Sequence, residues 1–499
     1  MRELTRQPSA EMGIDKVELE LDSRDDIPQT LRGLQYIFLT PPLRQEVFNI
    51  LNGIFPPELD LNNGRPGMDM WSILVMGVLR LSLNCDYDRL HNLVNNHKTI
   101  RQILGHGIID DGKSYSLQTI KDNVILLTPE ILDRVNQVVV KAGHELIKKK
   151  PENSSPSLEI AQPNEKLNGR CDSFVVETNV EYPTDIRLLF DAVRKIIELL
   201  MPLCKLLGLP DWQDGKAEIL KLKKLLRKIQ RLKHSSAKDE SKREARQKEI
   251  IEAHQEYLRV AKSLLERAEK TRLHIQQKDS QKKIKLLKIE EFFEHARRQI
   301  NQITRRVIQG ETIPPPEKVF SIFESHTEWL SKGKAGVPVE LGLNVCILED
   351  QYKFILHHRV MPHETDVDMP VLMVTETKAR FPELSSCSFD QGFHSPDHQK
   401  ELAKLLESVT RPKRGKPSKT EPARQQTKEF VEGRRQHAAI ESAINALEVH
   451  GLDRCPDRGL PAFQRYVALA VVARNTQILG RYLQLQEQQA ATEIARQAA

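Results

Sequence analysis

The chain has 499 residues, more than one hydrophobic core normally serves, so we expect it to fold as several structural units. Its formal net charge of +6 is modest for this length and does not by itself require a polyanionic partner. Six cysteines without a CxxC pair exclude a zinc ribbon and a disulfide framework, and they indicate free thiols in a reducing cytosol.

Residues 1–26 are polar and charged, and we expect them to be disordered. They contain no apolar core of a signal peptide, and no stretch of the chain offers the roughly 18 uninterrupted apolar residues of a membrane-spanning helix. We therefore expect a soluble bacterial protein that is cytoplasmic and associated with the nucleoid.

Residues 27–148 are expected to form a helical domain that binds DNA or mediates dimerisation. Prolines divide its first part into short helices, and the run from Met68 to Leu83 is apolar on all sides, which is typical of a buried helix. A later helix near residues 116–127 places Gln118 and Lys121 where an exposed face could read DNA. A solvated helix face explains the same pattern equally well.

Residues 149–168 have the composition of a linker, and a strand rich in β-branched and aromatic residues follows them. Side chains alternate along a strand, so Asp172 lies on the opposite face from Glu177 and Glu181. Asp185 comes just after this strand and is best explained as a cap of the next helix.

Residues 185–310 are expected to form a helical, coiled-coil-like insertion. One of its helices carries apolar residues at 3-4-3 spacing, namely Ile219, Leu222, Leu226 and Ile229. The same helix carries a run of basic residues: Lys221, Lys223, Lys224, Arg227, Lys228, Arg231 and Lys233. Two interpretations of this charge remain open, a solvated coiled-coil face and a phosphate-binding surface.

Strand character returns in residues 311–485, which we assign with residues 169–184 to one core. The expected elements are a hairpin of strands at 337–348 and 352–361, a short strand at 385–389, and helices near 398–407, 432–449 and 463–488. A C-terminal tail of residues 486–499 follows. A metal site could be sought among His357, His358, His363, Glu364 and Asp366. Adjacent histidines in a strand point to opposite faces, which disfavours one shared ion.

Three carboxylates stand where phosphodiester chemistry needs them. Asp172 lies within the first strand, Asp390 ends a short strand, and Glu441 lies in a helix after a basic loop. This order of elements is that of an RNase H-like nuclease core. Such chemistry uses two Mg²⁺ ions about 4 Å apart, and carboxylate oxygens suit Mg²⁺. We expect the three residues to hold Mg²⁺, with Mn²⁺ as a substitute.

Four segments resemble the signature blocks of insertion-sequence DDE transposases of the ISNCY group: DSFVVETNVEYPTD from Asp172, EWLSKGKAG from Glu328, CSFDQGFHS from Cys387 and IESAINALEVHGLDR from Ile440. The resemblance extends from about residue 27 to 481. It implies a transposase with an RNase H-like core and an N-terminal helical DNA-binding domain, and its catalytic triad falls on Asp172, Asp390 and Glu441. The implied partners are transposon-end inverted repeats, target DNA and further copies of the chain in a homodimer or higher oligomer.

Basic residues near the carboxylates are candidates for contacts that position a duplex without reading its sequence. They are Lys332, Lys334, Arg411, Lys413, Arg414, Lys416, Arg434 and Arg435. Related transposases often carry Tyr-x₂-Arg-x₃-Glu-x₆-Lys around the glutamate. The sequence departs from this pattern, since the four positions read Arg434, His437, Glu441 and Glu448.

The expected fold is therefore α+β and multidomain, with an RNase H-like α/β core interrupted by a long helical insertion, an N-terminal all-α domain and a helical C-terminus. The expected function is Mg²⁺-dependent DNA cleavage at transposon ends and strand transfer into target DNA. Two alternatives remain, a metal-dependent DNA nuclease without strand transfer and a catalytically inactive DNA-binding scaffold.

Overall fold

The computed structural model describes residues 13–54, 67–107, 112–148, 166–234, 240–278, 283–331, 339–412 and 425–498. The chain divides into two compact units, one of residues 1–179 with 330–499 and one of residues 180–329. It is a mixed α/β protein whose described strands join in one mixed sheet of seven. None of the described helices is long and apolar enough to cross a bilayer.

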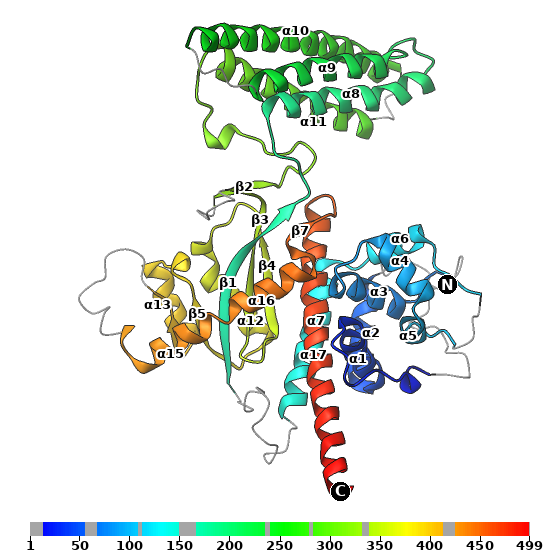
Figure 1. The fold of residues 1–499 in the computed structure, drawn as a ribbon, viewed down its shortest axis with the longest axis vertical. Helices are drawn as coiled ribbons and strands as arrows, with labels where there is room; N and C mark the ends of the chain where they lie inside the picture. The colour runs from blue at the N-terminus through cyan, green and yellow to red at the C-terminus, as the bar shows by residue number, and fades with distance from the viewer. Residues whose placement is uncertain are drawn as a thin grey trace. The chain divides into compact units, whose positions relative to one another are not determined.

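Strand β1 (Leu167–Thr178) lies at the centre of the sheet (Figure 1). On one side it pairs antiparallel with β3 (Val339–Glu349), which pairs antiparallel with β4 (Ile355–Met361) and also borders β2 (Glu328–Ser331). On the other side it pairs parallel with β5 (Leu384–Phe389), which pairs parallel with β6 (Ser408–Thr410). The short strand β7 (Arg454–Cys455) pairs with the end of β1. The predicted hairpin and the predicted strand before Asp390 are confirmed.

Four described helices between β4 and β7 in the chain lie against the sheet. They are α12 (Met369–Arg380), α13 (Pro396–Leu405), α15 (Lys428–His437) and α16 (Ile440–Leu447). Helix α12 contacts β3, β4 and β5, whereas α15 contacts β1, β5 and β6 and α16 contacts β1. Helix α12 was not among the predicted elements.

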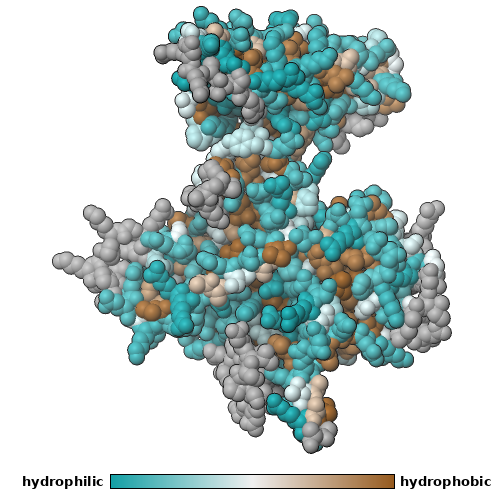
Figure 2. Space-filling view, in the orientation of Figure 1, coloured by the Kyte–Doolittle hydropathy of each residue, from teal (hydrophilic) through white to brown (hydrophobic). Residues whose placement is uncertain are grey.

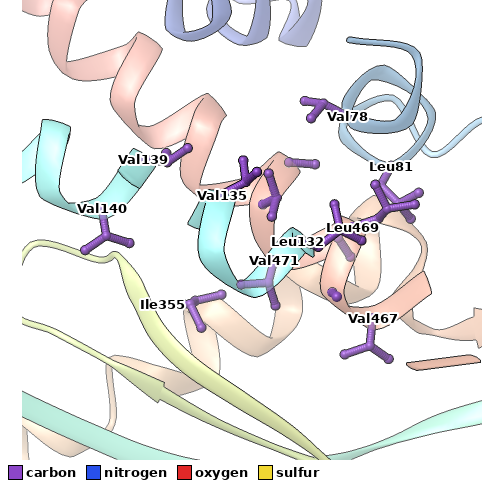
Figure 3. Close-up of a cluster of buried hydrophobic side chains, with 14 of the residues drawn as sticks. Val78, Leu81, Leu132, Val135, Val139, Val140, Ile355, Val467, Leu469 and Val471 are labelled. Carbon is purple, nitrogen blue, oxygen red and sulfur yellow. The ribbon is translucent and has the colours of Figure 1, made fainter. Parts of the chain in front are cut away.

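The N-terminal helices share a hydrophobic core with the sheet. They are α1 (Asp26–Leu39), α2 (Pro41–Leu51), α3 (Met70–Ser82), α4 (Tyr87–Asn96), α5 (Lys98–Ile103), α6 (Leu117–Val124) and α7 (Pro129–Lys148). Every residue of α3 is buried, as its apolar sequence predicts. Side chains of α3, α7, β4 and the C-terminal helix α17 (Leu460–Ala498) meet in this core (Figure 3). The boundary expected at 149–168 is therefore not a boundary between compact units.

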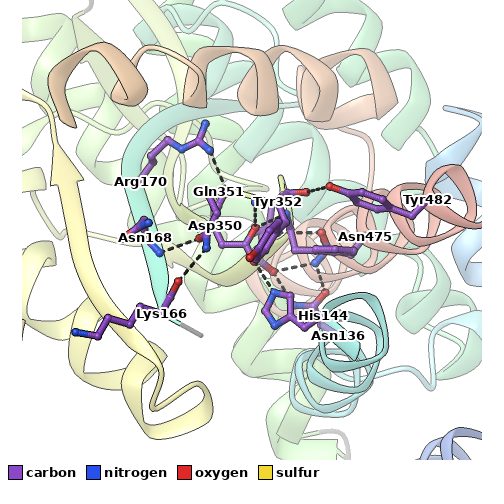
Figure 4. Close-up of polar contacts among 12 residues, drawn as sticks. Asn136, His144, Lys166, Asn168, Arg170, Asp350, Gln351, Tyr352, Asn475 and Tyr482 are labelled. Atoms are coloured by element: carbon purple, nitrogen blue, oxygen red, sulfur yellow. Dashed lines mark hydrogen bonds and ion pairs between the residues drawn. The ribbon is translucent and has the colours of Figure 1, made fainter. Parts of the chain in front are cut away.

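Polar contacts also join the helices to the sheet (Figure 4). The side-chain amide of Asn475 on α17 accepts the backbone N–H of Ile355 at 2.9 Å and donates to its carbonyl at 2.8 Å. Asn136 on α7 donates to the same carbonyl at 3.0 Å. His144 Nε2 on α7 lies 2.6 Å from the fully buried carboxylate of Asp350 in the β3–β4 turn. Satisfied buried groups of this kind fix one packing of helix on sheet.

Two terminal segments differ from their predictions. Ile14 and Val17 are buried in the first unit, and Gln484 of α17 donates to the carbonyl of Leu21, so the described residues 13–25 are not a disordered tail. At the other end α17 continues through the expected tail to Ala498. Residues 1–12 lie outside the described part of the chain.

The second unit is a helical bundle with its own hydrophobic core. Its helices are α8 (Asp185–Leu206), α9 (Gly215–His234), α10 (Glu240–Lys278) and α11 (Lys283–Ile303). The apolar stripe predicted on α9 is buried at Leu222, Leu226 and Ile229. On the face shown in Figure 2 the exterior of this unit is mainly hydrophilic.

Candidate functional site

Parallel pairing of β1 with β5 brings Asp172 and Asp390 to adjoining positions. The last pair of this ladder is Cys171 with Phe389, and each aspartate is the next residue along its own segment. Paired residues of neighbouring strands point to the same face, and the face alternates at each residue. Asp172 and Asp390 therefore point to the same face of the sheet, although the whole helical insertion separates them in the sequence.

Glu441 comes from helix α16, in whose first turn it lies. The preceding turn of chain carries His437, whose Nδ1 lies 3.1 Å from the hydroxyl of Ser388 on β5. Burial lowers the pKa of His437, the carboxylates of Asp390 and Glu441 act against this shift, and Arg170 acts with it. Since Ser388 shares a face with Asp390, its contact with His437 puts the end of α15, and with it the start of α16, on the Asp390 side of the sheet.

The three carboxylates differ in their exposure. Asp390 and Glu441 are exposed, and Asp172 is half-buried with one carboxylate oxygen accepting the N–H of Ser173 at 2.8 Å. Their oxygens are suitable donors for Mg²⁺. Within the described ranges, however, no three His, Cys, Asp or Glu side chains are close enough together to hold a metal ion. The sheet thus brings the carboxylates to one region without forming a ready-made metal cage.

Asp366, one of the residues of the disfavoured metal cluster, lies on the Ser173 side of β1, opposite Asp172. Its Oδ1 accepts a 2.6 Å hydrogen bond from the hydroxyl of Ser173, the residue after Asp172. Its other oxygen lies 3.7 Å from where a Cβ on Gly392 would be, two residues after Asp390. Asp366 begins a short 3₁₀ helix, Asp366–Asp368, capped by Thr365. This capping pattern was the one local signal that its position was fixed.

A pocket of about 350 Å³ opens between the sheet and α15. Its floor includes Arg170, Ser386 and Ser388, which share a face with Asp172 and Asp390 because they are two or four residues away along their strands. Gly433 of α15 lies in the roof, where a Cβ would be 2.2 Å from the hydroxyl of Thr410. A residue without a side chain is therefore what allows α15 to approach β6 this closely.

Several predicted DNA contacts can be placed. Arg434 and Arg435 are exposed on α15, and Gln118 is exposed on α6, where it donates to Asp122 at 2.7 Å. Lys121 is half-buried, with its ammonium 5.7 Å from the ring centroid of Tyr87. Lys332, Lys334, Lys413, Arg414 and Lys416 lie outside the described residues.

The prediction that Arg411 contacts DNA is wrong in this structure. Arg411 has no exposed surface, and its guanidinium donates to the carbonyls of Phe393 at 3.1 Å and Ser395 at 2.8 Å. These contacts hold the segment that follows Asp390. Arg411 is thus a structural residue behind the carboxylates.

The competing acidic residues have ordinary structural partners. Glu177 pairs with Arg454 of β7, and Glu181 pairs with Arg187. Asp185 is the first residue of α8, one position after the N-cap Thr184, and lies 2.9 Å from Arg306.

The two adjacent histidines of β4 have separate environments. His357 contacts Glu376 at 2.8 Å and Arg380 at 2.7 Å, whereas burial strongly lowers the pKa of His358. Neither belongs to a metal-holding group in the described part of the chain.

Comparison of the chain with protein-family models, with curated proteins and with solved structures found no match. The function is therefore argued from the geometry of the site and from the chemistry of its residues.

Proposed function

We propose that the chain is a DDE transposase that cleaves DNA at transposon ends and joins the freed ends to target DNA. The observation that carries this proposal is the parallel pairing of β1 with β5, which puts Asp172 beside Asp390. Helix α16 contacts β1 and supplies Glu441. The order of elements, an aspartate-bearing strand, two antiparallel strands, a parallel strand ending in aspartate and a glutamate-bearing helix, is that of an RNase H-like core.

The proposed cofactor is Mg²⁺, with Asp172, Asp390 and Glu441 as the residues that would hold it. When bound, the ions would activate the attacking water or 3′-hydroxyl and offset the charge of the scissile phosphate. The exposure of Asp390 and Glu441 supports this role, since a backbone phosphate of a duplex must reach the same oxygens.

Basic side chains near the site fit a DNA substrate. Arg434 and Arg435 are exposed on α15, less than two helical turns before Glu441, where their guanidinium groups can contact the backbone of a bound duplex. Gln118 on α6 is the proposed contact in the N-terminal helices. We propose double-stranded DNA and further copies of the chain as the partners.

The test uses full-length protein and a plasmid that carries the DNA flanking the gene, incubated with Mg²⁺ or with EDTA. Asp172→Asn, Asp390→Asn and Glu441→Gln should each reduce nicking and strand transfer to background while binding to the same DNA is retained. The matched control is Glu177→Gln, which removes a carboxylate from the opposite face of the same strand and should retain activity.

Strand transfer that survives any of the three substitutions contradicts the proposal. Nicking without joining would identify a nuclease instead. Absence of Mg²⁺-dependent nicking in the unmodified protein, with DNA binding intact, would identify a scaffold.

A further inference from the structure

Helix α9 of the second unit carries an unusually one-sided charge. Its 20 residues include eight Lys and Arg side chains and a single acidic residue, Glu218. Its apolar stripe, Leu222, Leu226 and Ile229, is buried against the bundle. At about 100° per residue the opposite side of the helix must face solvent.

The solvent side of α9 is formed by basic residues. On this side the exposed basic residues are Lys216, Lys221, Lys223, Lys224, Arg227, Lys228 and Arg231. Two of them have acidic partners, since Lys228 lies 3.3 Å from Glu256 and Lys221 lies 3.9 Å from Glu218. In the described part of the chain, no ion pair joins Lys224, Arg227 or Arg231 to a carboxylate.

On the neighbouring helix α10, by contrast, exposed basic residues alternate with acidic residues along the sequence. Its exposed Lys248, Arg259 and Lys262 form no ion pair in the described part of the chain either, but each stands three or four residues from a glutamate, at Glu252, Glu256 and Glu266 respectively. Opposite charges at this spacing stabilise a helix by roughly 0.2–0.5 kcal/mol per pair.

The charges of α9 do not serve its folding. Lys224 and Lys228, like Arg227 and Arg231, stand four residues apart, and like charges at this spacing oppose the helix. An uncompensated row of cations on a packed helix is instead suited to a polyanion.

We infer that the exposed basic side of α9 binds the phosphate backbone of duplex DNA. From Lys216 to Arg231 the helix rises roughly 22 Å, and duplex DNA presents one phosphate charge per roughly 1.7 Å of its axis. The apolar stripe is already buried in the bundle, so this side offers charge without an apolar face for a membrane. Lysine and arginine contacts of this kind hold a duplex without reading its sequence.

The choice of DNA rests on the proposed function, and in it the helical unit binds the substrate. DNA binding by α9 does not require catalysis at Asp172. Binding and cleavage are therefore measured separately, so that either can fail alone.

The experiment measures binding of full-length protein to a labelled 30-base-pair duplex of arbitrary sequence by fluorescence anisotropy, from about 50 to 300 mM KCl. The test variant carries Lys224→Gln, Arg227→Gln and Arg231→Gln. The matched control carries Lys248→Gln, Arg259→Gln and Lys262→Gln on α10, which removes the same net charge. Circular dichroism and thermal midpoints check that both variants are folded.

We expect the test variant to bind more weakly and its plot of log affinity against log salt to become shallower by about 2 to 3, since each lost phosphate contact removes about 0.9 from the slope. In the control variant the slope should change by less than about 0.9, the contribution of a single phosphate contact. Nicking of DNA is assayed separately, with the unmodified protein and with Asp172→Asn.

An unchanged slope in the folded test variant, or an equal change in the control, would overturn the inference. Duplex RNA of the same length that displaces the DNA at lower concentration would overturn the choice of DNA. Loss of nicking by Asp172→Asn, or its retention, bears only on the proposed function.

Discussion

The hydroxyl of Ser388 on strand β5 lies 3.1 Å from Nδ1 of His437, which ends helix α15. Ser388 stands two residues before Asp390, and His437 stands four residues before Glu441. One contact thus joins the segments that supply two of the three carboxylates. Because Nδ1 is engaged, Nε2 is the nitrogen left to face other groups.

The first prediction follows from this contact. His437→Ala and Ser388→Ala should each lower Mg²⁺-dependent nicking by about 10- to 100-fold, the usual range for losing a group that orients a ligand. Affinity for DNA should hardly change. Ser408→Ala, on the exposed end of β6, serves as the control. Full nicking activity in both variants would show that the contact is only structural.

The close approach of α15 to β6 gives a second prediction. Gly433→Ala puts a Cβ about 2.2 Å from the hydroxyl of Thr410, a stiff side chain. We expect the free energy of unfolding to fall by about 1–3 kcal/mol, as for other overpacked sites. Gly53→Ala is the control, since a Cβ there meets no atom within 4 Å. Urea denaturation of both variants measures the difference, and equal stabilities would contradict the packing described here.

A third prediction concerns the buried ion pair of Arg80 with Asp457. The guanidinium donates to both carboxylate oxygens, at 3.0 and 2.7 Å, and its side chain is only 3% exposed. Arg80→Met leaves the largely buried carboxylate of Asp457 with Arg465, 3.6 Å away, as its remaining ion-pair partner among the described residues, and should cost about 1–3 kcal/mol of stability. The double variant Arg80→Met with Asp457→Leu removes that carboxylate and should regain part of this loss. A double variant no more stable than the single one would argue against pairing as the cause.

The fourth prediction is a dependence of stability on pH. Burial, with help from the charges of His357 and Arg380, lowers the pKa of His358 from 6.5 to about 3. The folded state therefore binds fewer protons than the unfolded state between these values, so stability is present above pH 6.5 and falls as the pH drops. His358→Phe should flatten the decline by up to about 1.4 kcal/mol per pH unit. Urea titrations at several pH values from 7.5 to 5.0 measure this, and parallel curves for the two proteins would rule the contribution out.

Periodic patterns in the sequence predicted much of the fold. The all-apolar run that forms α3 and the 3-4-3 stripe of α9 are confirmed, because burial of an apolar surface follows directly from the spacing. The short strand before Asp390 is also confirmed. Helix α12 was missed, since residues such as Val371, Val374 and Thr377 favour strands, and only packing against the sheet makes the segment helical.

Long-range contacts were beyond the sequence. The expected separation of the N-terminal helices fails because Asn136 and Asn475, on helices far apart in the chain, meet at Ile355. Arg411 was assigned to DNA from its basic neighbours, yet its carbonyl partners Phe393 and Ser395 decide its burial. At the site, the face on which Asp172 lies and the strand before Asp390 could be predicted from the local sequence. The position of Asp366 and the contact between Ser388 and His437 depend on the tertiary fold.

The amides that meet Ile355 have a consequence for self-association. An edge strand normally has unpaired backbone N–H and C=O groups, and these can pair with a strand of another chain and cause aggregation. At Ile355 on β4 both groups are already engaged by side chains of α7 and α17. A polypeptide cut short before α17 would lose that protection, and inclusion bodies rather than dispersed protein are the outcome we anticipate for it.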